Sequence, residues 1–432
     1  MFCDQCEQAF RGVGCTTVGI CGKDEDIEAL QKLLLYGLKG MAAYKHHARR
    51  LGQDDPAVNA FIEEALFATM TNVNFDAASL LEMCLECGRQ NLRVMQMLND
   101  GHVAAFGKPS PATVREGTQA GLGILITGHD LLDLADLLRQ VKGTPIKVYT
   151  HGEMLPAHMY PRLREHPNLA GHYGGAWQKQ RDEFEAFGGP IVGTTNCVLI
   201  PRDDNTYGPR FFTTRATAVP GAMRLTDGDF GPVIRAALAF PPLTESFQRE
   251  STVGFHYSVL LDAAPQIIEA VKAGTIRHFF LIGGCDGAEP GRNYYAELAQ
   301  RTPANTIILT LGCGKYRIRD YDYGTVAGFP RLLDMGQCND AYGAIQTALA
   351  LAEAFGCGVN ELPLTLVISW FEQKAVAVLL TLLALGVKGI RIGPAAPAFL
   401  SPGVLSALRE QFDLRLIDPA ADPAAELAEI LN

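Results

Sequence analysis

Hydrophobic and polar positions follow two different patterns along the chain. Residues 24–51, 56–70 and 76–98 carry apolar side chains at the spacing of a helix face, which predicts three amphipathic helices. The first begins with three acidic residues, which the helix dipole favours at an N-terminus. From residue 123 onward, short runs of Val, Ile and Leu bounded by Gly or Pro predict buried parallel strands. We therefore expect a small antiparallel three-helix bundle followed by α/β segments.

The α/β part alternates strand-like runs with helical segments, an order that predicts parallel sheets. Gly107, Pro109 and Pro111 interrupt the pattern and indicate a domain boundary. We expect three domains, at residues 1–106, 107–253 and 254–432. The longest apolar run, residues 375–385, is too short to span a bilayer and is interpreted as a buried helix.

Seven hydrophobic runs each end near a side chain that can bind a metal. These side chains are His129, Glu153, Cys197, Cys285, Cys313, Cys338 and Glu372, with Lys374 just beyond the last. Taken singly, each has a simpler explanation, as a helix-capping histidine, a surface carboxylate or a core cysteine. However, ligand sites of parallel α/β sheets lie beyond the carboxyl ends of the strands. The repeated pattern therefore predicts one shared site.

The predicted ligands are of mixed chemical type. Thiolates select iron–sulfur chemistry, whereas imidazole and carboxylate are harder ligands. We expect a cluster in which nitrogen and oxygen bind part of the iron, with oxo bridges and an open position for a small molecule. His151, His158 and His172 are close in sequence, and we consider them as supporting or proton-transfer residues.

A separate group of cysteines opens the chain, in the spacing Cys3-x2-Cys6-x8-Cys15-x5-Cys21 with glycines between them. Four sulfurs suit zinc or an iron–sulfur cluster. The uneven spacing favours a 4Fe-4S cluster over zinc, and a disulfide pair is disfavoured. Cys84 and Cys87 share a helix face and are expected to pack in the core rather than to bind a metal.

The composition excludes several functional classes. The net charge is −10, and the chain has no run of Lys or Arg, which argues against nucleic-acid binding. Met1 is followed by neither a basic nor an apolar leader, so we expect a cytoplasmic protein with no membrane segment. Eleven cysteines in such a protein indicate metal or redox chemistry rather than a disulfide framework.

At this level of detail the chain resembles the hybrid cluster proteins, the prismane or hydroxylamine reductase family. Nine motifs spread over nearly the whole chain carry the resemblance. They are the N-terminal cysteine box and the segments TNVNF at 71–75, GHD at 128–130, HGEMLP at 151–156, TTNC at 194–197, GCDG at 284–287, GCGKY at 312–316, GQCND at 336–340 and WFEQKA at 370–375.

The resemblance implies two cofactors. A proximal 4Fe-4S cluster is implied at Cys3, Cys6, Cys15 and Cys21. A hybrid 4Fe-2O-2S cluster is implied on His129, Glu153, Cys197, Cys285, Cys313, Cys338 and Glu372. It further implies that Cys285 can carry a persulfide and that Lys374 lies beside the cluster. Glu372, Lys374, Cys285 and His129 are the implied catalytic residues.

The implied fold is a cysteine box and a helical bundle, then two Rossmann-like parallel α/β domains with the cluster between them. The implied activity is reduction of hydroxylamine to ammonia and water, with an external redox protein as electron donor. Nitric oxide reduction, or a nitric-oxide-responsive nitrosylating role in nitrosative stress, is the alternative. A nickel enzyme like carbon monoxide dehydrogenase and a zinc-stapled structural protein are the other rivals.

One feature departs from the longer family members, which have two three-helix bundles. Only one bundle fits between Cys21 and His129, as in the short class of the family. The sequence leaves open the electron donor, the physiological nitrogen substrate and whether the protein forms a homodimer.

Overall fold

A computed structural model describes residues 1–431, which form two compact units. Unit 1 joins residues 1–101 to residues from 351 onward, so its two parts are distant in sequence. Unit 2 comprises residues 102–350. The mixture of helices and parallel sheets confirms the expected multidomain α and α/β fold. The boundaries of three domains at 1–106, 107–253 and 254–432 stay a prediction.

The three predicted N-terminal helices are present, as α1 (Glu25–Arg50), α2 (Pro56–Ala68) and α3 (Ala77–Phe106). Asp24 caps α1 by accepting a hydrogen bond from the Ile27 N–H, at 2.9 Å, as polar residues before a helix do. Helix α3 extends eight residues beyond the expected end at residue 98. Its sequence contains no proline, and Gly107, with φ of +91°, follows its last residue.

Helix α13 (Gln373–Ala384) joins this group and packs against α1. Glycines allow the close approach, because a Cβ atom at Gly88 of α3 would collide with the backbone carbonyl of Leu380. Thr381 completes the contact, since its hydroxyl donates to the carbonyl of Gly88 at 3.0 Å and accepts from the Asn91 side chain at 3.0 Å. The buried helix expected near residue 375 thus packs with N-terminal helices.

The rest of unit 1 contains three neighbouring parallel strands and several short helices. The remaining elements are η1 (Phe10–Gly12), η6 (Val359–Glu361), β14 (Leu364–Ser369), β15 (Arg391–Gly393), α14 (Pro402–Phe412), β16 (Arg415–Leu416) and α15 (Pro423–Leu431). Helix α12 (Ala341–Phe355) begins in unit 2 and ends in unit 1.

Unit 2 contains an eight-stranded sheet in the order β7-β6-β5-β2-β3-β4-β1-β8, antiparallel only between β1 and β8. Its strands are β1 (Ala112–Glu116), β2 (Gly123–Thr127), β3 (Lys147–His151), β4 (Leu169–His172), β5 (Ile191–Gly193), β6 (Phe211–Thr213), β7 (Met223–Arg224) and β8 (Arg249–Val253). Strands β2 and β5 are buried throughout, as the unbroken apolar runs predict.

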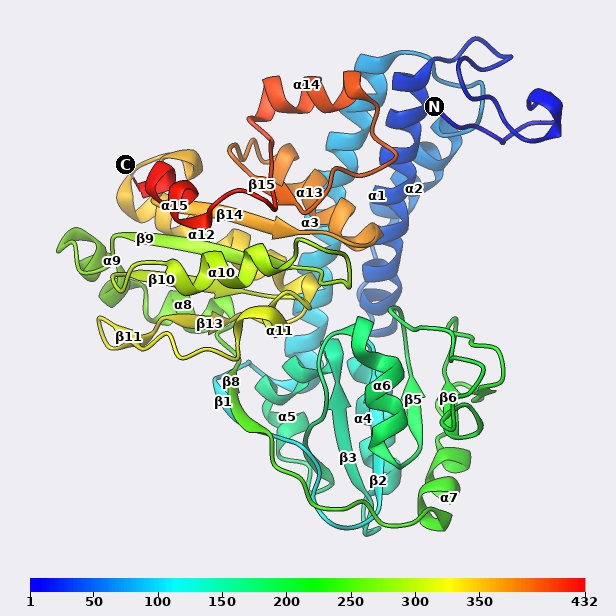
Figure 1. The fold of residues 1–432 in the computed structure, drawn as a ribbon, viewed down its shortest axis with the longest axis vertical. Helices are drawn as coiled ribbons and strands as arrows, with labels where there is room; N and C mark the ends of the chain where they lie inside the picture. The colour runs from blue at the N-terminus through cyan, green and yellow to red at the C-terminus, as the bar shows by residue number, and fades with distance from the viewer. Residues whose placement is uncertain (432) are drawn as a thin grey trace. The chain divides into compact units, whose positions relative to one another are not determined.

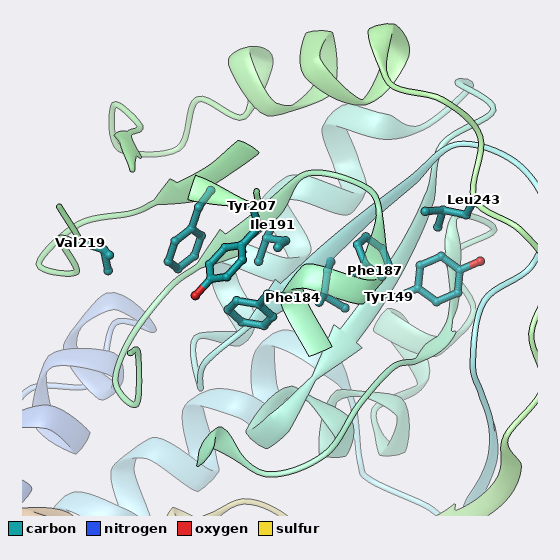
Figure 2. Packing of buried hydrophobic residues seen from close by; sticks show 9 residues of the cluster. Tyr149, Phe184, Phe187, Ile191, Tyr207, Val219 and Leu243 are labelled. Carbon is teal, nitrogen blue, oxygen red and sulfur yellow. The ribbon is translucent and has the colours of Figure 1, made fainter. Parts of the chain in front are cut away.

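The helices of this part are α4 (Leu131–Val141), η2 (Gly152–Met159), α5 (Pro161–Arg164), η3 (Trp177–Lys179), α6 (Gln180–Phe187), η4 (Gly208–Arg210) and α7 (Gly231–Ala239). Helix α6 lies beside the strands of this sheet (Figure 1), and Figure 2 shows its aromatic side chains in the buried cluster. Phe184 and Phe187 lie beside Tyr149 and Tyr207. This core fixes the strands whose ends carry the predicted ligands.

The second part of unit 2 contains strands β9 (His278–Gly284), β10 (Thr306–Thr310) and β13 (Leu332–Asp334), which run parallel with β10 in the middle. The other elements are α8 (Tyr257–Asp262), α9 (Ala264–Lys272), α10 (Asn293–Arg301), α11 (Lys315–Ile318), η5 (Cys338–Asp340) and the hairpin β11 (Thr325–Val326) and β12 (Phe329–Pro330). Within residues 1–431, every helix is too short or too polar to cross a lipid bilayer.

Candidate metal centre

Three predicted ligands follow neighbouring strands of the eight-stranded sheet. His129 comes two residues after β2, Glu153 lies in η2 directly after β3, and Cys197 follows β5. Strand β2 pairs with both other strands, and the registers place Thr127 opposite His151 and opposite Gly193. The three strand ends are therefore level at one edge of the sheet.

Three cysteines follow the ends of the other parallel strands in the same way. Cys285 follows β9, Cys313 lies three residues beyond β10, and Cys338 begins η5 after β13. Thr310 is opposite Asp334 in the register of β10 and β13. The strand-end pattern expected from the sequence therefore holds at both edges.

The two sets of strand ends meet within unit 2. Ligand atoms of His129, Glu153 and Cys338 all lie within 4.8 Å of one another. The backbone N–H of Cys338 donates a hydrogen bond to Glu153 Oε2 at 2.9 Å. An imidazole, a carboxylate and a thiol thus share one small volume, although each comes from a different loop.

The other thiols of unit 2 lie near this triad. Burial raises the pKa of Cys313 well above its usual range, and the negative charges of Glu153, Cys197 and Cys285 act in the same direction. A bound cation removes this penalty, because metal coordination deprotonates thiols and offsets their mutual repulsion. The donor set of one imidazole, one carboxylate and four thiols therefore fits an iron–sulfur group that also has oxygen and nitrogen ligands.

Local hydrogen bonds orient His129. The Thr195 hydroxyl donates to the carbonyl of Asn196 at 2.8 Å, so its oxygen can accept from both the backbone N–H and Nδ1–H of His129, each at 2.9 Å. A metal bound by His129 would therefore be held through Nε2. Asp130 begins α4 as its N-cap, accepting from Leu132 N and Asp133 N.

The three neighbouring histidines are buried and hydrogen-bonded. Thr150 Oγ1 lies 3.0 Å from His158 Nε2 and 2.9 Å from His172 Nδ1, while His172 Nε2 lies 3.1 Å from the Tyr316 hydroxyl. Burial lowers the pKa of His158 to about 4 and that of His172 well below its usual range. The neutral, hydrogen-bonded imidazoles of His158 and His172 favour a supporting role over proton transfer.

Tyr316 connects this network to the loop that carries Glu153. Its hydroxyl donates to the carbonyl of Gly152 at 2.7 Å. Separately, His151 is held between Thr127 at 2.9 Å and Glu183 at 2.8 Å. The sequence pattern predicts no role for Tyr316 or Thr195. Both lie within three residues of a predicted ligand, and this proximity is the sequence feature that points to a role at the site.

Glu372 and Lys374 belong to unit 1, where they lie at the start of α13. Glu372 is the N-cap of this helix and accepts from the Lys374 backbone N–H at 3.1 Å. Lys374 is buried, and its Nζ lies 3.9 Å from Glu372 Oε1 and 6.0 Å from the centre of the Tyr44 ring. Their part in the metal centre stays a prediction.

The N-terminal cysteines also lie in unit 1. Cys3 and Cys15 are paired through two backbone hydrogen bonds of 3.0 and 2.8 Å, and Cys6 and Cys21 are half-buried. The buried side chain of Lys23 lies beside Cys3 and forms an ion pair with Glu28. Within residues 1–431 these four cysteines form no disulfide, so their thiols are available to bind a metal.

Cys84 and Cys87 are buried in α3. Cys84 Sγ lies 3.7 Å from the carbonyl of Leu30, and a Cβ at Gly37 would lie 3.1 Å from Cys87 Sγ. Burial raises the pKa of Cys87 to about 12, so its thiol stays protonated. These contacts favour core packing against α1.

Comparison with known proteins gives strong matches over the full length. The model of a family described as the Prismane/CO dehydrogenase family matches residues 1–84 and 76–424. A protein named hydroxylamine reductase from Moorella thermoacetica is 59% identical over 100% of both chains. One of that name from Thermotoga maritima is 48% identical over 100% of this chain and 99% of its own. Another, from Rhodospirillum rubrum, is 54% identical over 93% of this chain and 73% of its own length.

Solved structures give the fold independently. Carbon monoxide dehydrogenase IV from Carboxydothermus hydrogenoformans matches with a TM-score of 0.80 and 15% identity, covering 100% of this chain and 91% of that one. The nickel-free carbon monoxide dehydrogenase from Thermococcus sp. AM4 matches with a TM-score of 0.77 and 16% identity, covering 100% of this chain and 90% of that one. At this identity the likeness establishes a shared fold.

Proposed function

The chain belongs to the Prismane/CO dehydrogenase family, and we propose that it is an oxidoreductase that reduces hydroxylamine to ammonia and water. Membership confirms the resemblance drawn from the motifs. Relatives named for this activity match the chain from end to end. The observation that carries the proposal is the gathering of imidazole, carboxylate and thiol groups at one place in unit 2.

We propose two iron–sulfur cofactors, and the donor types support both. Cys3, Cys6, Cys15 and Cys21 would hold a 4Fe-4S cluster. A hybrid 4Fe-2O-2S cluster would be held by His129, Glu153, Cys197, Cys285, Cys313, Cys338 and Glu372. When bound, these groups supply electrons and a Lewis-acidic iron that polarises an N–O bond. Cys285 is the proposed position of a persulfide.

The reaction consumes two electrons and two protons, breaks the N–O bond, and releases ammonia and water. An external redox protein would supply the electrons. Lys374 is the proposed proton donor, since its ammonium group is buried and lies 3.9 Å from Glu372 Oε1. A positioned acid typically contributes about 10²–10⁴-fold in rate. His129 and Glu153 are held by backbone and side-chain hydrogen bonds, which fixes the ligands before substrate arrives.

The first test is iron content and hydroxylamine turnover after oxygen-free purification. Cys338→Ala and Glu372→Ala should retain the iron of the N-terminal cluster, lose much of the remaining iron and lose turnover. We expect turnover to fall by at least about 10–100-fold, the scale on which disturbed metal sites lose activity. Cys357→Ala is the matched control, because Cys357 is half-buried and outside both predicted sites. Full turnover in the Glu372 variant would count against its assignment.

The same preparations discriminate among the rival functions. A nitric-oxide-handling protein would turn over nitric oxide in the steady state but reduce hydroxylamine poorly. A nickel content close to one atom per chain would favour chemistry like that of carbon monoxide dehydrogenase. Zinc without iron would indicate a structural role and would contradict the proposed reductase.

A further inference from the structure

Gln337 lies between the loops that carry the three clustered ligands. The residue is only 1% exposed. The Nε2 atom lies 3.2 Å from the carbonyl oxygen of His129 and 2.6 Å from that of Glu153, and donates to both. A glutamine amide has two N–H donors, so each carbonyl receives one of them.

The backbone of Gln337 is fixed as well. Its N–H donates to Asp340 Oδ2 at 2.7 Å, at the start of η5. The next residue is Cys338, whose N–H donates to Glu153 Oε2 at 2.9 Å. Gln337 therefore joins the Cys338 loop to the loops of His129 and Glu153, in addition to the direct hydrogen bond between Cys338 and Glu153.

We propose that Gln337 is a positioning residue, which sets the spacing of His129, Glu153 and Cys338 and so makes the site competent to bind iron. The inference rests on the proposed metal centre but not on which substrate is reduced. It goes beyond the ligand set, because Gln337 is not among the predicted ligands and its Nε2 atom donates to the backbone carbonyls of two residues that are.

The chemistry of the side chain explains why glutamine suits this position. Methionine has nearly the same length but no donor, so it would leave two buried carbonyl oxygens without these bonds. Glutamate has the same shape, but as a carboxylate it would place an acceptor against two other acceptors. Either substitution should loosen the triad without removing a ligand.

The test compares Gln337→Met and Gln337→Glu with Gln140→Met. Gln140 is the matched control, because its amide also makes two hydrogen bonds, donating to the Gly228 carbonyl at 2.7 Å and accepting from the Phe230 N–H at 3.0 Å. Each protein is purified without oxygen, and iron per chain, the electron paramagnetic resonance spectrum and circular dichroism are measured. The N-terminal cluster serves as the internal reference.

We expect both Gln337 variants to keep the N-terminal cluster and the circular dichroism of the wild type. Iron affinity at the second site should fall about 10–100-fold, as with the loss of outer hydrogen-bonding partners, and its resonance signal should change. Gln140→Met should keep both signals.

Two results would overturn the proposal. One is a Gln337→Met protein with wild-type iron and an unchanged spectrum. The other is loss of both clusters together with the circular dichroism signal. That result would mean that Gln337 is needed for the whole protein to fold rather than for the spacing of the ligands. If Cys338→Ala also keeps all its iron, the metal centre itself is wrongly assigned, which separates the two failures.

Discussion

Several side chains near the candidate metal centre hold the predicted ligands by hydrogen bonds to backbone groups at or beside those ligands. Thr195 orients His129 through two contacts of 2.9 Å. Tyr316 holds the carbonyl of Gly152 beside Glu153. Side chains that are already held by two hydrogen bonds lose little further conformational entropy when a metal binds. Burial also lowers the pKa of several histidines. The free energy of unfolding should therefore depend on pH.

His256 provides a test of that consequence. Burial lowers its pKa to about 4, and the charge of Lys108 adds to the effect. In the unfolded state the pKa of the His256 imidazole is about 6.5. Between about pH 6.5 and 4 the unfolded state therefore binds a proton at His256, whereas the folded state does not. Stability from this group is complete above that window and declines as the pH falls through it.

The matched substitution is His256→Asn. His256 caps α8 by accepting from the Ser258 N–H at 3.3 Å, and asparagine can cap a helix without titrating. Between about pH 6.5 and 5, the free energy of unfolding of the wild type should fall more steeply, by up to about 1.4 kcal/mol per pH unit. Denaturant unfolding of both proteins measures this difference. Parallel curves would contradict it.

At the level of elements, the decisive contact in unit 1 is between α13 and the N-terminal helices. Gly40 of α1 faces the backbone of Gln373, and Gly88 of α3 faces the backbone of Leu380. Thr381 adds hydrogen bonds across the contact. Since both glycines meet backbone atoms rather than flexible side chains, an added methyl group would force the helices apart.

Gly88→Ala should therefore destabilise the protein, in spite of the better helix propensity of alanine. We expect a loss of about 1–3 kcal/mol, the usual cost of overpacking a core. Gly231→Ala, at the start of α7, is the control, since its Cβ would meet only the side-chain ends of Asp229 and Arg235. Thermal unfolding compares the two. If Gly88→Ala and Gly231→Ala had the same melting temperature, α13 could move away from α3 without loss of stability, which would contradict the prediction.

On the scale of the whole molecule, regular secondary structure is unevenly distributed, and the predicted N-terminal metal-binding segment contains little of it. The first long helix begins only at Glu25. Before it, the cysteine box has one short helical turn, a backbone bridge between Cys3 and Cys15, and several exposed apolar side chains. Such a segment has little core of its own, so we expect its order to depend on the proposed cluster.

Removing iron with a chelator under oxygen-free conditions should therefore loosen residues 1–22 more than the rest. We expect the circular dichroism to change little, because the long helices lie elsewhere. Proteolysis within the box should become several-fold faster, since unfolded segments are cut preferentially. Mass spectrometry of the fragments locates the cuts. Cleavage that rises equally throughout the chain would contradict an independent box.

The sequence by itself determined the elements and the chemical types of the candidate ligands. Helices and strands follow from local spacing of apolar residues, and α1 and α2 agree with the expected ranges 24–51 and 56–70 to within two residues at each end. Strand-end positions identified His129, Glu153 and Cys338 because parallel strands aim their carboxyl ends in one direction. These are short-range properties, so they can be seen in the order of residues.

Only the tertiary structure decided which loops meet and what holds them. The 4.8 Å grouping of His129, Glu153 and Cys338 depends on packing between strands far apart in sequence. The same holds for the Gln337 amide, which bonds to residues 208 and 184 positions away, and for α13 against α1. Such contacts form where side-chain shape and buried hydrogen bonding agree across the fold, and no local spacing encodes that agreement.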